Sequence, residues 1–168
     1  MIFTVTIIVV GSALIVMRGK ESAPVNATDP MTVAQAHFDS GEYQAAIDIY
    51  MCAIRTNPAD ADAYVRVAHT YRYWGKYQES EEMFRKAIEL RPNDPLIWTD
   101  LGKLYRNAND YQKSEDAFKR SIELNPTEST TYSYGLGYLY LQQKRFDDAE
   151  RLFKKAYELD PDLEINIY

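Results

Sequence analysis

The sequence predicts an all-α protein in which an array of helix-turn-helix repeats follows one transmembrane helix. Two observations predict the array: prolines recur at intervals of 34, 34 and 35 residues, and each interval contains two apolar stripes of helical period separated by a turn signal. The transmembrane helix is predicted because the first seventeen residues contain no charged side chain. We therefore expect an anchor at 1–17, a linker at 18–28, the repeats at 29–161 and a C-terminal tail at 162–168.

The expected anchor, MIFTVTIIVVGSALIVM, would form a helix about 25 Å long, slightly shorter than the ~30 Å hydrocarbon core of a bilayer. A cleaved signal peptide is the main alternative, although no basic residue precedes the apolar run and no small-residue cleavage site follows it; a buried core helix is another. Arg18 and Lys20 flank its C-terminal end, so the positive-inside rule favours a single-pass protein with its repeats on the cytoplasmic side. In the linker, the glycosylation sequon Asn26-Ala27-Thr28 would matter only in a secretory lumen.

Composition excludes several classes of function. The formal net charge of -6 argues against a nucleic-acid partner, because such domains need a basic surface for phosphates. Cys52 is the only cysteine, so the chain has neither an internal disulfide nor a cysteine-based zinc or redox site. A chain of 168 residues with 46% apolar content can bury one modest core or one short array.

The repeat is visible at many equivalent positions. Small residues recur where two helices must approach closely, and large residues follow three positions later, as interlocking side chains require. The repeat-ending prolines are Pro58, Pro92, Pro126 and Pro161; the small positions are Ala34, Ala68, Gly102 and Gly137; the large ones are His37, Tyr71, Tyr105 and Tyr140; in the second helices the sets are Ala46, Ser80, Ser114 and Ala149, then Tyr50, Phe84, Phe118 and Phe153, then Ala53, Ala87, Ser121 and Ala156.

Local signals mark the ends of the helices. Asp29-Pro30 and Asp94-Pro95 place an N-cap acceptor before a proline at the first helical position. Between the two helices of each repeat, Gly41, Gly75 and Asn109 suit a left-handed turn, and Lys144 is the weaker equivalent in the fourth repeat. Acid-first i,i+4 pairs on the second helices, such as Glu81/Arg85 and Glu115/Lys119, indicate a solvated outer face.

This pattern resembles the tetratricopeptide repeat (TPR) family over about residues 27–161. The resemblance implies a right-handed superhelical array of four repeats, at about 27–60, 61–94, 95–129 and 130–161. Three departures stand out: His37 replaces the usual tyrosine, Ser133 falls where Trp98 and Tyr64 lie in other repeats, and one extra residue lies between Pro126 and the fourth repeat. We expect looser packing or a local adjustment of register there.

In that family, the first helices line a concave groove that receives extended peptides or partner helices. In the expected groove, basic side chains would bind carboxylates of an acidic or extended partner segment, while tyrosines stack on its apolar side chains. The alternative is ordinary solvated charge, because Asp62 and Asp100 dilute the basic residues. Carried over from the family by position, the candidate partner-binding residues are Arg66, His69, Arg72, Tyr73, Lys103, Arg106, Asn107, Tyr134 and Tyr138.

No enzyme, cofactor or metal site is expected. His37 lies at a packing position, and His69 lacks a matched cysteine or an HExxH partner. The GLGYLY run at 135–140 lies within a helical stripe and is not a phosphate loop. Repeats that bind heat-shock chaperone tails carry lysine, asparagine and basic residues at four positions that are different here, so such tails are not expected as partners. Those positions hold Met31, Gln35, Leu96 and Asp100.

The segment after Pro161 is a second candidate for interactions. Solenoids normally finish with a polar capping helix, whereas this sequence continues as DLEINIY. Leu163, Ile165 and Ile167 alternate with polar residues, so the tail is predicted to dock on the last repeat, add to a partner's sheet edge or mediate self-association; truncation of a longer array is the alternative.

The sequence as a whole predicts a membrane-anchored TPR scaffold for protein–protein interactions, or an assembly factor for a membrane complex. One alternative is a permanent structural subunit whose anchor and repeats are both buried against larger membrane subunits. Another is an exported, soluble TPR interaction protein released by signal cleavage. Repeat arrays serve many clients on one fold, so the fold alone does not name the partner.

Overall fold

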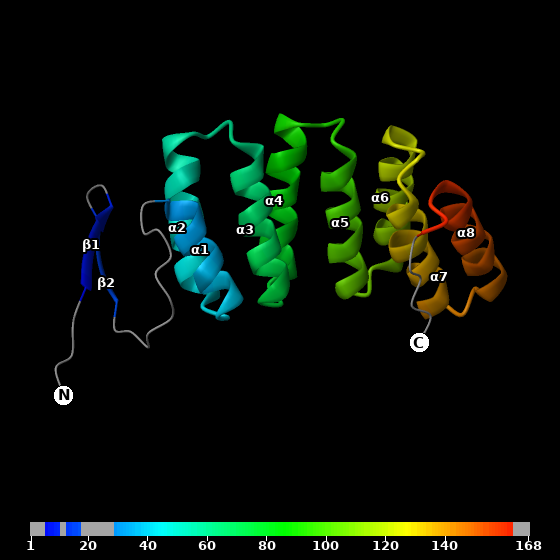
Figure 1. Cartoon of the computed structure of the whole chain (residues 1–168), viewed down its shortest axis with the longest axis horizontal. Helices are drawn as coiled ribbons and strands as arrows, with labels where there is room; N and C mark the ends of the chain where they lie inside the picture. Colours follow the sequence, from blue (N-terminus) through cyan, green and yellow to red (C-terminus); the bar gives the residue numbers. More distant parts are fainter. Residues whose placement is uncertain (1–5, 11–12, 18–28, 163–168) are drawn as a thin grey trace.

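The computed structural model describes residues 6–10, 13–17 and 29–162. Within 29–162 every regular element is helical, and the helices form a row of antiparallel pairs (Figure 1). The all-helical repeat array predicted from the period is therefore confirmed. Its elements are α1 (Pro30–Asp39), α2 (Tyr43–Thr56), α3 (Ala61–Tyr73), α4 (Tyr77–Leu90), α5 (Pro95–Asn107), α6 (Tyr111–Leu124), the π-helix η1 (Thr131–Gly137), α7 (Tyr138–Gln142) and α8 (Phe146–Leu159).

The N-terminal segment differs from its prediction. In place of a helix over 1–17, β1 (Thr6–Val10) and β2 (Ala13–Met17) pair as antiparallel strands, with Thr6 opposite Met17. Every residue of β1 is β-branched, and such side chains favour strands over helices. The absence of charge predicted an apolar segment but did not distinguish a helix from strands. In the described ranges, no helix is both long and apolar enough to cross a bilayer. The expected linker at 18–28 and nearly all of the expected tail lie outside the described residues.

Each pair is held by the small and large residues that recur in the sequence. Ala68 and Phe84 are fully buried in the second pair, as are Ala34 and Ala46 in the first. At Gly102, a Cβ atom would lie 2.7 Å from the ring of Phe118, so only glycine allows α5 and α6 to approach this closely. The recurrence of small residues therefore reflects direct helix contact.

The predicted caps and turns are confirmed. Asp29 and Asp94 accept hydrogen bonds from the backbone N–H groups of Met31 and Leu96. The predicted turn residues all adopt positive φ angles, which end the first helix of each pair in a left-handed conformation. These angles are 75° at Gly41, 80° at Gly75, 60° at Asn109 and 59° at Lys144.

The fourth pair contains the predicted adjustment of register, but at a different place. Helical structure begins at Ser129, 34 residues after Pro95, whereas Gly137 follows Gly102 by 35 residues. The extra residue therefore lies inside the helix, where η1 accommodates it as π-helix, and not before the helix as the proline spacing suggested. As a consequence Tyr132, and not Ser133, takes the position of Trp98.

The contact between the third and fourth pairs is more polar than the one before it. Thr99 Oγ1 lies 2.6 Å from Ser121 Oγ and 3.2 Å from Thr131 Oγ1, and all three side chains are buried. The equivalent residues between the second and third pairs are Val65, Ala87 and Ile97, which belong to an apolar cluster. Hydrogen bonds thus replace apolar packing at these three positions, while Phe118 of α6 still packs in an apolar cluster with Leu136 and Leu139.

Candidate functional site

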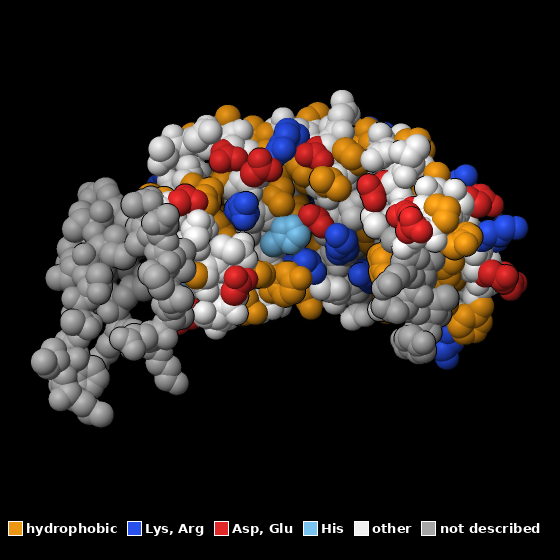
Figure 2. Space-filling view, in the orientation of Figure 1, with side chains coloured by type: hydrophobic (Ala, Val, Ile, Leu, Met, Phe, Trp, Pro, Cys, Tyr) orange, Lys and Arg blue, Asp and Glu red, His pale blue; other side chains and the backbone are white. Residues whose placement is uncertain are grey.

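The candidate site lies on the first-helix face, defined here as the surface formed by α1, α3, α5, η1 and α7. Figure 2 shows a histidine near the middle of the molecule with Lys and Arg side chains beside it. Helix α3 carries four of the candidate residues and α5 carries three; these are Arg66, His69, Arg72 and Tyr73 on α3, and Lys103, Arg106 and Asn107 on α5. The structure therefore presents these candidates on neighbouring first helices.

A network around Asp100 connects α3 and α5. Asp100 Oδ2 lies 2.8 Å from His69 Nε2, and Asp100 Oδ1 accepts a hydrogen bond of 2.9 Å from Lys103 Nζ. On the other side of the imidazole, Arg72 Nη2 lies 3.3 Å from His69 Nδ1. Because arginine can only donate, this geometry fits a His69 ring with its proton on Nε2, donating to Asp100. Both oxygens of the Asp100 carboxylate are thus engaged.

Asp100 remains ionised despite its burial. Burial by itself raises the pKa of this carboxyl, but the hydrogen bonds from His69 and Lys103 and the positive charge of Lys103 outweigh that effect and lower the pKa below its ordinary value. The sequence reasoning treated Asp100 only as a diluting charge. The structure instead makes it the acceptor that holds two predicted site residues, His69 and Lys103, in place.

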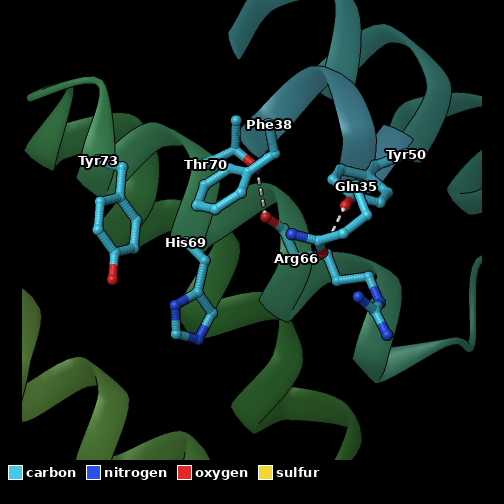
Figure 3. A pocket seen from close by; sticks show the side chains of 7 residues that line it. All are labelled: Gln35, Phe38, Tyr50, Arg66, His69, Thr70 and Tyr73. Atoms are coloured by element: carbon cyan, nitrogen blue, oxygen red, sulfur yellow. Dashed lines mark hydrogen bonds between the residues drawn. The ribbon is translucent and has the colours of Figure 1, made fainter. Parts of the chain in front are cut away.

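A pocket opens between the first two helix pairs (Figure 3). The side chains of Arg66, His69 and Tyr73 project from α3 on the same side, and Arg66 is exposed. Tyr73 is 58% exposed, and its ring packs edge-on against Phe38 of α1 at a centroid distance of 5.2 Å. The lining residues are Gln35, Phe38, Tyr50, Arg66, His69, Thr70 and Tyr73.

Toward the fourth pair, the candidates are more engaged with the protein itself. Arg106 is partly buried, and its Nη1 donates a hydrogen bond of 2.6 Å to the carbonyl oxygen of Tyr134. The rings of Tyr134 and Tyr138 stack on each other at a centroid distance of 5.4 Å, and Tyr138 also contacts Phe153 edge-on. Asn107 is exposed at the end of α5. The two tyrosines therefore act partly as packing residues.

An exposed tryptophan was missed by the sequence reasoning. Trp74 directly follows α3, and its ring contacts Tyr43 at a centroid distance of 6.3 Å. The Nζ atom of Lys76 lies over the Trp74 ring, 3.6 Å from the ring centroid. The equivalent turn residues are Ser40, Ala108 and Gln143. Since the fold accepts small and polar residues there, the break in the repeat pattern was the signal that would have singled out Trp74.

The geometry is that of a binding surface. Its charged groups lie on an open face, with aromatic rings toward both ends and guanidinium groups between them. In the described ranges, no three side chains of the metal-binding types gather into a group that could hold a metal ion. The fold and this face together define a helical-repeat protein whose first helices present an open, charged face.

Comparisons with known proteins identify the repeats. Residues 60–127 and residues 99–164 each match the tetratricopeptide repeat, so the two matches together span 60–164. The chain therefore contains tetratricopeptide repeats, as its resemblance to the family predicted. A search of curated proteins gave no match.

Solved structures of MamA proteins have a similar fold. A crystal structure of MamA has a TM-score of 0.68 at 21% sequence identity, covering 79% of this chain and 77% of that one. The structure of MamA 41-end from Desulfovibrio magneticus RS-1 has a TM-score of 0.68 at 20% sequence identity, covering 83% of this chain and 80% of that one. The structure of MamA from MSR-1 has a TM-score of 0.64 at 23% sequence identity, covering 83% of this chain and 81% of that one. At these identities the similarity concerns the fold.

Proposed function

We propose that this chain is a protein-interaction scaffold that binds an acidic segment of a partner protein on its first-helix face. One observation carries the proposal: Arg66, Arg72 and Arg106 form no ion pair with any described residue, although the chain as a whole has a net charge of -6. Cations without a counter-charge of their own attract a complementary partner and orient it during association.

The second helices provide an internal comparison. Arg85 pairs with Glu81, Lys119 pairs with Glu115 at 2.7 Å, and Arg120 pairs with Glu123 at 2.9 Å. Most basic side chains of the second helices are thus paired within one helix, and the acid-first spacing predicted the pairs of Arg85 and Lys119. Arg55 of α2 and Lys154 of α8 form no ion pair with a described residue. The contrast supports a binding role for the first-helix face and a solvated role for the second helices.

The proposal includes attachment to a membrane through the N-terminal segment. The first seventeen residues contain no charged side chain, and transfer of apolar side chains out of water is favourable. The repeats would then act on the cytoplasmic side as a scaffold or assembly factor for a membrane complex. Flotation of the full chain with lipid vesicles tests this part. Substitution of Ile8 and Leu14 by lysine should abolish flotation; unchanged flotation of that variant would contradict attachment through this segment.

The interaction itself is tested by purifying the full chain from its native membrane in mild detergent, with mass spectrometry before and after a high-salt wash. We expect salt-labile partners, because screening weakens contacts between exposed charges. Stoichiometric membrane subunits that resist the wash would instead indicate a permanent structural subunit. Loss of the Met1 end from the mature chain would indicate an exported protein.

A further inference from the structure

Two arginines occupy equivalent positions on neighbouring first helices. Arg72 lies in the last turn of α3 and Arg106 in the last turn of α5, 34 residues later. The corresponding residues in the first and fourth repeats are Phe38 and Leu141. Because the same fold accepts apolar side chains at this position, neither packing nor helix capping requires an arginine there. The pair therefore calls for another explanation.

The two positive charges are placed where they repel each other. Burial lowers the pKa of Arg106, and the charge of Arg72 lowers it further. In addition, Arg72 Nε is buried and has no hydrogen-bond partner among the described residues. Like charges and an unpaired buried donor both cost free energy, and an anion bound between the two guanidinium groups would relieve the repulsion.

The protein does not supply that anion within its described part. The nearest carboxylate in the network, Asp100, uses one oxygen for His69 and the other for Lys103. Neither arginine forms an ion pair with any residue from 29 to 162. Residues 29–162 therefore provide no counter-ion for this pair of arginines.

Both guanidinium groups are already held in place. Arg72 Nη2 contacts His69 Nδ1 at 3.3 Å, and its guanidinium carbon lies 4.4 Å from the centre of the Tyr73 ring. Arg106 is fixed by the 2.6 Å hydrogen bond from Nη1 to the Tyr134 carbonyl and lies over the ring of Phe118 at 5.9 Å. Groups that are ordered before binding lose little conformational entropy when a ligand arrives.

We infer that Arg72 and Arg106 form a carboxylate-binding site between the second and third repeats, which takes an Asp or Glu side chain from an acidic protein segment. The inference rests on the proposed function, because it names the contact that such a partner makes. Guanidinium groups match the planar pair of oxygens of a carboxylate. Both arginines lie at helix C-terminal ends, whose partial negative charge disfavours the double charge of phosphate more than the single charge of a carboxylate. The exposed Tyr73 ring beside Arg72 offers an apolar surface for the stem of the same segment.

The test is isothermal titration calorimetry of the full chain, in non-ionic detergent, with a terminally blocked hexaglutamate peptide and a hexaglutamine peptide as reference. We expect hexaglutamate to bind and hexaglutamine not to bind. Arg72→Gln with Arg106→Gln should weaken hexaglutamate binding by at least about tenfold, because it removes both charge-assisted contacts. Arg72→Lys with Arg106→Lys keeps the charges but loses the forked geometry and should give an intermediate affinity.

A matched control removes two positive charges from the second helices. Arg85→Gln with Arg120→Gln changes the net charge equally but lies on exposed side chains paired within their own helices. We expect this control to change the affinity by less than about twofold. An equal loss in the control and the arginine-pair variant would overturn the site in favour of general charge attraction.

Two further outcomes would overturn the inference. The site would be excluded if hexaglutamate did not bind the wild-type chain. In a competition experiment at equal ionic strength, acetate should displace the peptide more strongly than inorganic phosphate does. Equal or stronger displacement by phosphate would exclude selectivity for carboxylates. Circular dichroism of each variant establishes that its helices are intact. If the variant Arg72→Gln with Arg106→Gln still recovers the natural partner, the carboxylate site is contradicted but the proposed scaffold function is not. If neither the wild-type chain nor any variant recovers a partner, the proposed function itself is contradicted.

Discussion

Asp100 accepts hydrogen bonds from His69 and Lys103, so a single carboxylate positions two side chains that come from different helices. The repeat pattern gave no indication of this role, because residue types that recur at equivalent positions of all four repeats indicate which side chains pack together. A contact between α3 and α5 depends on side-chain geometry across two repeats. Sequence reasoning placed His69 and Lys103 on the first-helix face but did not identify the acceptor between them.

Asp100→Asn should lower the free energy of unfolding at pH 6 by about 1–2 kcal/mol, because two donors lose a charged acceptor. The pKa of Asp100 is lowered in the folded protein, so its stabilising contribution is complete above the ordinary Asp pKa of about 3.9 and is lost as the pH falls through the lower folded value. The difference between wild type and variant, measured by urea unfolding, should therefore shrink as the pH is lowered from 5 toward about 3.

Asp48→Asn is the control for that experiment. Asp48 is exposed on α2, and its one hydrogen bond comes from Gln44 in the same helix. Its substitution should change stability by less than about 0.5 kcal/mol at pH 6. A wild-type advantage over Asp100→Asn that stayed constant down to pH 3 would show that the charge of Asp100 is not the stabilising factor.

At the scale of single elements, the sequence predicted the helices of the array better than it predicted the N-terminal segment. Helix starts at Asp29 and Asp94 and turns at Gly41 and Gly75 are specified by the residue itself, through a cap or a positive φ angle. The choice between helix and strand for an apolar run is not specified by hydropathy. There the β-branched residues of β1 were the stronger signal, and the prediction overlooked them.

Of the four turn residues with positive φ angles, Lys144 between α7 and α8 is the least suited to that conformation. Lys144 adopts a φ angle of 59°, a conformation that costs an ordinary residue about 1 kcal/mol or more. Lys144→Gly should therefore raise the free energy of unfolding by about 0.5–1 kcal/mol. Gln143→Gly, one position earlier with a φ angle of -84°, should lower stability, because glycine there only adds freedom to the unfolded chain. Opposite shifts of the two thermal midpoints are expected, and shifts of the same sign would contradict the strain at Lys144.

For the whole molecule, stability is a sum over repeats and the interfaces between them, so the weakest interface determines where the array opens. At three equivalent positions, the contact between the second and third repeats is apolar, with Val65, Ala87 and Ile97. The same positions between the third and fourth repeats carry the hydroxyl groups of Thr99, Ser121 and Thr131, and Thr131 is the first residue of the π-helix η1. Buried hydrogen bonds contribute less net free energy than buried methyl groups of similar volume, so we expect the fourth repeat to open separately. Only the comparison of equivalent positions in the structure identifies this interface.

Native-state hydrogen exchange at increasing urea concentration tests that expectation. Amides in residues 129–159 should lose protection at lower urea than those in residues 61–124. Transfer of the apolar residues to the weaker interface, by Thr99→Val, Ser121→Ala and Thr131→Ile, should raise the opening free energy of the fourth repeat by about 1 kcal/mol.

The reciprocal transfer is the control for the interface. Val65→Thr, Ala87→Ser and Ile97→Thr place hydroxyl groups between the second and third repeats, and η1 is unchanged. If the polar interface is the cause, this variant should gain a new opening step at the second interface. If η1 is the cause, neither transfer will move the boundary of early exchange, and residues 129–159 will open first in all three proteins.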